Sequence, residues 1–147
     1  MSLQMTKAER EAFLADVHVG VLSIPEPGRG PLAVPIWYAY EPGGDVRIVT
    51  ARGSRKGRLL AAAPRVSLCA QTESAPYRYA SIEGPVVHVG PADRARDVAP
   101  LARRYLGPEL GAQYLEATAS EAGEEILVRI RPERWLTVDY RKQFGGG

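Results

Sequence analysis

The order of apolar and polar positions predicts a chain built mainly from short β-strands. Apolar residues alternate with polar ones, or form β-branched runs that end at Gly, Pro or charged residues, in seven segments: 17–24, 32–40, 46–50, 65–71, 77–89, 125–131 and 135–139. Such patterns are typical of half-buried strands. The first two segments flank a Pro- and Gly-rich turn, so we expect them to form a β-hairpin.

Helical signals are few and short. Thr6 and Glu9 have the spacing of a capping box, in which each side chain satisfies a free backbone N–H of the other residue, so a helix is expected to reach about Asp16. Ser54 is a suitable N-cap for a second short helix, which Pro64 ends.

A third helical region lies in the C-terminal half. Apolar residues recur with helical spacing over 93–106, Gly107 and Pro108 should end that helix, and 110–118 predicts another short one. Six or seven strands with short helices favour an antiparallel β-barrel that is closed or nearly closed.

Length and composition agree with one globular domain. The chain has 147 residues, of which 45% are hydrophobic and 24% charged, values ordinary for a folded soluble domain. We expect a single domain over 6–140 with flexible ends at 1–5 and 141–147. Apolar runs are too short for a membrane span, no signal peptide is evident, and Cys69 is the only cysteine, so the expected location is cytoplasmic, with no membrane partner. Cys69 is expected to be a small buried apolar residue.

Charge is unevenly distributed. The net charge is only +2, but 46–72 holds six basic residues and no acidic one, whereas the rest carries 13 basic and 17 acidic residues. A local basic segment on a slightly acidic body favours a discrete anionic ligand over a long polyanion, although a solvated basic face would look the same. Binding of single-stranded nucleic acid therefore ranks last among the possible functions, and no nucleic-acid partner is expected.

The segment 50–58 carries the most specific chemistry. A predicted strand ends at Thr50, Gly53 permits a tight turn, and Ser54, Arg55 and Lys56 open a helix. Free N–H groups and two adjacent cations suit a phosphate. Neither a P-loop nor a Gly-x-Gly-x-x-Gly motif occurs, so a nucleoside triphosphate is disfavoured.

Over 6–140 the sequence resembles the flavin- and deazaflavin-binding split barrels that include pyridoxamine 5'-phosphate oxidase. The resemblance rests on four segments: 34–38 (Val-Pro-Ile-Trp-Tyr), 50–58, 64–68 (Pro-Arg-Val-Ser-Leu) and 76–79 (Pro-Tyr-Arg-Tyr). It implies a mainly β fold with short helices, a six-stranded antiparallel Greek-key split β-barrel, that forms a homodimer with two cofactors at the subunit interface.

The resemblance also implies a set of cofactor-binding residues. Those expected at the phosphate are Thr50, Ser54, Arg55, Lys56 and Arg58. Those expected along the ring system are Pro35, Ile36, Trp37 and Tyr38, with Trp135 as a further wall. Those expected to reach in from the other subunit are Tyr77, Arg78 and Tyr79.

Two cofactors fit the resemblance. Segment 53–56 is similar to FMN-binding oxidases, whereas 35–38 and 76–79 are similar to actinobacterial members that use the deazaflavin coenzyme F-420. The implied activity is hydride transfer to a small conjugated or aromatic substrate. The alternative is a non-enzymatic protein that binds FMN, haem or another tetrapyrrole on the same barrel.

Other chemistry is not indicated. No histidine follows His88, so the oxidase's C-terminal Arg and His pattern is missing and oxidation of pyridoxamine phosphate is not expected. His18 and His88 are the only histidines, too few for an evident metal site. A hydride-transfer site needs no resident acid and base, and no catalytic residue is assigned, although Tyr77 or Tyr79 could donate a proton or simply pack at an interface.

Overall fold

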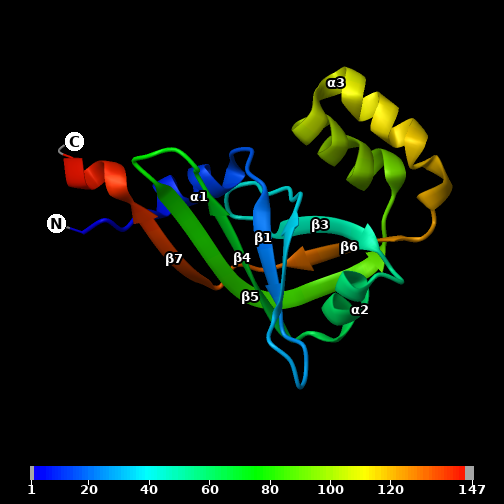
Figure 1. The fold of residues 1–147 in the computed structure, drawn as a ribbon, viewed down its shortest axis with the longest axis horizontal. Helices are drawn as coiled ribbons and strands as arrows, with labels where there is room; N and C mark the ends of the chain where they lie inside the picture. Colours follow the sequence, from blue (N-terminus) through cyan, green and yellow to red (C-terminus); the bar gives the residue numbers. More distant parts are fainter. Residues whose placement is uncertain (1, 145–147) are drawn as a thin grey trace.

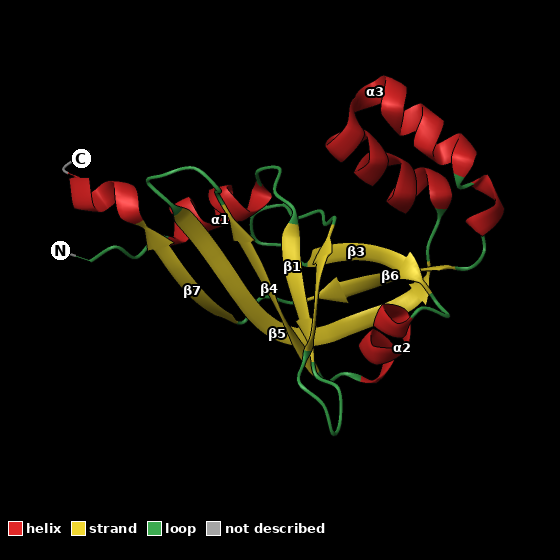
Figure 2. Cartoon of the chain, viewed as in Figure 1, coloured by secondary structure: helices red, strands yellow, loops and turns green. Residues whose placement is uncertain are grey.

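A strongly bent antiparallel sheet forms the centre of the computed structural model, which describes residues 2–144 (Figure 1). Its strands are β1 Gly20–Ile24, β2 Leu32–Ile36, β3 Val46–Ala51, β4 Arg65–Gln71, β5 Arg78–Pro91, β6 Glu125–Ile130 and β7 Arg134–Asp139. They follow the order β2-β1-β4-β5-β6-β3, with β7 paired to β5. The sheet with its few short helices confirms the mainly β split barrel, and its seven strands match the seven segments that alternation predicted, one more than the six that the resemblance implied (Figure 2).

The long strand β5 bends the sheet. Its first half pairs with β4 on one side and β7 on the other, whereas its second half pairs with β6. The register shifts between Val86 and His88, and a bulge of this kind increases the local bend and twist. The two halves of β5 therefore belong to the two halves of the barrel.

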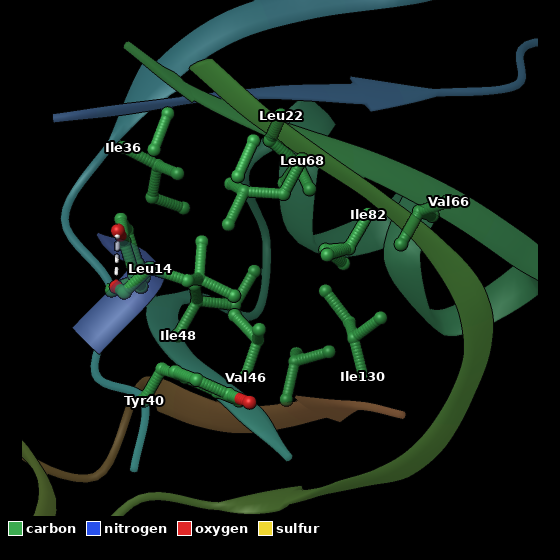
Figure 3. Packing of buried hydrophobic residues seen from close by; sticks show 14 of the residues in the cluster. Leu14, Leu22, Ile36, Tyr40, Val46, Ile48, Val66, Leu68, Ile82 and Ile130 are labelled. Carbon is green, nitrogen blue, oxygen red and sulfur yellow. Dashed lines mark hydrogen bonds between the residues drawn. The ribbon is translucent and has the colours of Figure 1, made fainter. Parts of the chain in front are cut away.

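Inward-pointing apolar side chains, which alternate along the strands, fill the core between these halves. In β4, Val66, Leu68 and Ala70 are buried while the residues between them are half-buried. Figure 3 shows Leu68 among the inward-pointing aliphatic side chains of several strands. Cys69 lies on the opposite face of β4 and is half-buried, so the expectation of a buried apolar cysteine was wrong. The alternation of period two decides this, because both neighbours of Cys69 point inward.

The first helix, α1 Lys7–Ala15, begins as expected. Thr6 and Glu9 form the complete capping box, and the helix places Phe13 and Leu14 in the core. The hydroxyl of Tyr38 donates a hydrogen bond to the Leu14 carbonyl at 2.7 Å. This bond fixes α1 against the segment that follows β2.

Both ends of the described chain contact the rest of the domain, while the flexibility expected for 1–5 and 141–147 stays a prediction. Met5 is buried and its N–H donates to Thr137 Oγ1 at 3.0 Å. The N–H of Asp139 donates to the Leu3 carbonyl at 2.8 Å, and a 3-10 helix covers Tyr140–Phe144. Leu3 and Met5 therefore lie against β7, whose edge offers free hydrogen-bonding groups, and Lys142 joins the C-terminal helix to the Gln4 carbonyl and to Glu9. Met1 and 145–147 lie outside the described residues.

The remaining helices lie at the β3–β6 end. Helix α2 covers Arg55–Ala62, and a π-helical turn over Arg94–Val98 leads into α3 Ala99–Ala117. Gly107 breaks α3 with a φ of 81°, which a residue with a Cβ rarely adopts. The two arms of α3 fold back on each other above β3 (Figure 1). A short 3-10 helix, Ala119–Glu121, follows, and none of the described helices is long and apolar enough to cross a membrane.

Candidate functional site

A cavity of about 400 Å³ lies between β2, β3, the start of α2 and α3. We call it the aromatic pocket. Pro35, Ile36 and Trp37 line one side of it, and Lys56 lines it from the first turn of α2. The structure thus brings together one part of each of two expected sets, the ring-binding strand and the phosphate-binding helix.

Two tyrosines of α3 pack on Trp37, and one of them, Tyr114, lines the pocket together with Trp37. The ring of Trp37 stacks on Tyr105, with centroids 5.1 Å apart and an angle of 4°, and tilts against Tyr114 at 5.3 Å and 53°. We did not anticipate Tyr105 or Tyr114 from the sequence. The sequence signal that could have indicated them is their position on either side of Gly107. A break at this glycine folds α3 back on itself, so that a tyrosine from each arm can contact Trp37.

The hydroxyl of Tyr105 connects α3 to the barrel. It accepts the N–H of Tyr38 at 3.1 Å and lies 2.6 Å from the carbonyl oxygen of His18 and 3.0 Å from that of Tyr38. These contacts use backbone groups that would otherwise extend the hairpin. They explain why β1 begins at Gly20 and β2 ends at Ile36, inside the ranges 17–24 and 32–40 that alternation predicted.

Tyr38 itself does not enter the pocket. Its side chain is fully buried and its hydroxyl is bonded to Leu14. Burial raises the pKa of this phenol above its usual value, so Tyr38 stays neutral. In this chain the Tyr38 backbone is held by Tyr105, and the pocket wall consists of Pro35, Ile36 and Trp37.

Hydroxyl groups of the basic segment are largely occupied by the turn into α2. Ser54 Oγ accepts the Gly57 N–H at 3.0 Å and donates to the Ala51 carbonyl at 2.7 Å. Thr50 is buried, and its hydroxyl lies 3.4 Å from Ser54 Oγ. Ser54 is therefore the N-cap of α2, and Thr50 supports it from the end of β3.

Among the cations of this segment, Lys56 is the one that lines the aromatic pocket. Arg55 forms an ion pair with Glu26, including a bond from Nε to Oε2 at 3.2 Å, and this partner lowers the pKa of Glu26. Arg58 donates to the Gly53 carbonyl at 2.6 Å. Within the part of the chain that the structure describes, no carboxylate pairs with Lys56. Its ammonium group is the cation best placed for an anion in the aromatic pocket.

The pocket also contains one carboxylate. Glu125 is buried and pairs with Arg94 at 2.9 Å, while Arg94 Nη2 donates to the Leu115 carbonyl at 2.9 Å and to Thr118 Oγ1 at 3.0 Å. Arg94 thus balances the charge of Glu125 and ties β6 to the end of α3. Burial raises the pKa of the nearby Tyr114, with a smaller contribution from acidic neighbours.

The remaining expected residues lie away from the pocket within one chain. Arg78 and Tyr79 begin β5, with Tyr77 just before them, at the end of that strand remote from β6. Tyr77 is 52% exposed, and the Arg78 guanidinium lies 5.1 Å from the Phe13 ring centroid.

Trp135, the other expected wall residue, packs on the α1 side of the sheet. The Arg10 guanidinium lies 4.7 Å from its ring, and Tyr40 meets it edge-on at 6.2 Å. Only a second chain could bring these residues to the aromatic pocket of the first.

Metal ligands do not gather anywhere in residues 2–144. No group of three or more His, Cys, Asp or Glu side chains could hold an ion there. His18 instead stacks on Phe13 with centroids 4.4 Å apart, and its Nε2 lies 3.1 Å from the Phe13 carbonyl. Burial lowers the pKa of this imidazole, which favours the neutral ring.

Comparison with known proteins gives a consistent result for sequence and fold. The family model described as pyridoxamine 5'-phosphate oxidase matches residues 6–139. No curated protein matches the sequence. Among solved structures, a conserved hypothetical protein from Mycobacterium tuberculosis is 25% identical with a TM-score of 0.78, over 97% of this chain and 90% of that chain.

Two further structures share the fold at lower identity. A protein named F-420 reductase is 23% identical with a TM-score of 0.68, over 86% of this chain and 94% of that chain. The FAD and heme binding protein from Mycobacterium smegmatis is 18% identical with a TM-score of 0.66, over 98% of this chain and 80% of that chain. These likenesses support the split-barrel fold.

Proposed function

The chain belongs to the pyridoxamine 5'-phosphate oxidase family, and on that basis we propose that it is an oxidoreductase that binds coenzyme F-420 or FMN in the aromatic pocket. The proposed reaction is hydride transfer to a small conjugated or aromatic substrate. The observation that carries the proposal is the meeting of Lys56 with Trp37 in one cavity. A cation for a phosphate and an aromatic wall for a ring are the two features that this class of cofactor needs.

The residues present fit such a group. Pro35, Ile36 and Trp37 offer an apolar wall, Lys56 offers an ammonium group at the start of α2, and the cavity measures about 400 Å³. Glu125 would oppose an anion if it were unpaired, but Arg94 neutralises it. Electrostatic repulsion between Glu125 and a bound phosphate is therefore small.

Each part of the chain has a distinct task in this proposal. Lys56 would hold the phosphate by a charge-assisted hydrogen bond, and Trp37, kept in place by Tyr105 and Tyr114, would orient the ring system. The cofactor, when bound, would supply the hydride. The apolar residues Val49 and Leu101 would exclude water beside it.

Dimer formation is part of the proposal. Tyr77, Arg78 and Tyr79 would reach the aromatic pocket of a second copy, since in their own chain they lie at the far end of β5. Tyr77 is exposed and Arg78 and Tyr79 are half-buried, so each has surface available for such a contact. Light scattering should therefore show a dimer, and a monomer at working concentration would remove these three residues from the site.

Both F-420 and FMN are compatible with the proposed site. One similar structure is named F-420 reductase, which favours the deazaflavin. A second candidate function, cofactor binding without turnover, is favoured by the similar structure of a FAD and heme binding protein. Turnover of the reduced cofactor in the presence of an acceptor distinguishes the two functions.

The decisive experiment is a titration of the purified protein with F-420 and, separately, with FMN, followed by fluorescence. We expect Lys56→Ala to weaken binding of the preferred cofactor about 10- to 100-fold, the value of one charge-assisted hydrogen bond. Lys7→Ala, which removes an exposed lysine from α1, is the matched control and should leave the affinity unchanged. Equal affinities for wild type and Lys56→Ala would contradict the assignment of the pocket.

A further inference from the structure

A second, larger cavity adjoins the aromatic pocket. It measures about 780 Å³ and lies between the outer face of β3, β6 and β5 and the overhanging π-turn and α3. Val49 and Leu101 line both cavities. A molecule in the second cavity could therefore reach the aromatic pocket without crossing the barrel wall.

The strand register places two contrasting rows on the floor of this cavity. In one row Arg47 of β3, Arg129 of β6 and His88 of β5 are direct cross-strand neighbours. In the row two residues along, Val49 pairs with Leu127. The floor thus combines a basic edge with an apolar surface, and opposing like charges in a sheet are unfavourable unless an anion lies between them.

The charges around the cavity are only partly balanced. Glu41 pairs with Arg47 at 3.0 Å, and Asp97 pairs with Arg96 at 2.9 Å. Among the described residues, no carboxylate pairs with Arg129. The cavity is thus lined by only two carboxylates, against four arginines: Arg47, Arg96, Arg104 and Arg129.

Arg104 adds a buried donor without a partner. Its Nη2 donates to the carbonyls of Ala15 and Asp16 at 2.8 and 2.9 Å, but its Nε is buried without a hydrogen-bond partner. Such an orphaned donor is costly. This nitrogen is closed off where α3 meets the end of α1, so it belongs to that contact, and an anion is indicated instead by Arg129, without a carboxylate partner in residues 2–144, and by the excess of arginines around the cavity.

We propose that this cavity binds the carboxylate of an organic acid whose apolar body lies against Val49 and Leu127. The guanidinium of Arg129 would pair with the carboxylate, because its planar fork matches the two oxygens. The assignment of the acid as the substrate rests on the proposed function, since the shared wall would direct the apolar body towards the aromatic pocket. Binding of the acid itself does not depend on it.

The test uses 2-naphthoate and its neutral amide, 2-naphthamide, as probes in calorimetric titrations of the full chain without cofactor. We expect naphthoate to bind at least ~10-fold more tightly than naphthamide, and Arg129→Gln to remove most of that difference, as expected for a charged hydrogen bond. Arg129→Lys should retain part of it because the charge stays while the fork is lost. Arg134→Gln, an exposed arginine on β7, is the matched control and should bind naphthoate as the wild type does.

Three results would overturn the proposal. They are equal binding of acid and amide, an equal loss in Arg129→Gln and Arg134→Gln, and a weakening of F-420 or FMN binding by Arg129→Gln, which would assign the cavity to the cofactor. Loss of cofactor binding in Lys56→Ala with naphthoate affinity unchanged would support two separate sites. If neither cofactor binds the wild type but naphthoate does, the function proposed above fails while the acid site stands.

Discussion

Tyr105 should be the residue that holds α3 over the aromatic pocket, and Tyr105→Phe tests this directly. The change keeps the ring that stacks on Trp37 and removes only the hydroxyl. That hydroxyl accepts the Tyr38 N–H at 3.1 Å and contacts the His18 carbonyl at 2.6 Å. Two hydrogen bonds of ordinary strength contribute about 1–3 kcal/mol, and because the group is only partly buried we expect a loss of about 1–2 kcal/mol in the free energy of unfolding.

The assay is urea denaturation combined with thermal melting. For a domain of this size the expected loss corresponds to a Tm lower by roughly 3–6 °C. Limited proteolysis should cleave α3 sooner than in the wild type, since the hydroxyl connects it to the barrel. A change confined to α3 would appear in proteolysis before it appears in global unfolding.

Tyr114→Phe is the matched control. Tyr114 also contacts Trp37, but within the described residues its hydroxyl has no hydrogen-bond partner, so the expected change is below about 0.5 kcal/mol. The reasoning would be refuted by equal losses in the two variants, which would mean that ring packing and not the hydroxyl anchors α3. A Tyr105→Phe protein as stable as the wild type would refute it as well.

Two other predictions concern stability. Ser54→Ala should cost about 1 kcal/mol in denaturant unfolding because the N-cap of α2 is lost; unchanged stability would mean that Ser54 does not cap the helix. The Arg141 guanidinium holds the pKa of Asp139 below its usual range. The ionised carboxylate therefore stabilises the fold fully above the unfolded pKa of about 4, and this stabilisation is lost as the pH falls through the lower pKa of the folded state. Asp139→Asn should therefore be less stable than wild type by about 1 kcal/mol at pH 7, with the difference shrinking below pH 4; a difference independent of pH would contradict this.

Much of the local structure could be predicted because its causes lie a few residues apart. The capping box needs only Thr6 and Glu9, the start of α2 only Ser54, and the break in α3 only Gly107. The inward set of β4 follows from alternation of period two. By the same rule Cys69 should have been placed on the outer face, where it lies, instead of being assigned by its residue type.

The candidate site was only partly predictable. The basic segment and 35–37 were found because each is continuous in sequence, and Lys56 and Trp37 do line one cavity. The pairing of Arg55 with Glu26 could not be foreseen, since the two residues come together only when the turn after β1 lies beside α2. This pairing shifts the main phosphate-binding task in our proposal from Arg55 to Lys56.

By itself, the sequence determined the succession of elements, because capping, alternation and glycine breaks act over four residues or fewer. Tertiary structure decided which surfaces meet. Tyr105 lies 67 positions from Tyr38, and nothing between them in sequence indicates that its hydroxyl would end a strand and hold a helix over Trp37. Contacts at such separation depend on how the bent sheet positions α3, so the wall of the pocket is a property of the fold as a whole.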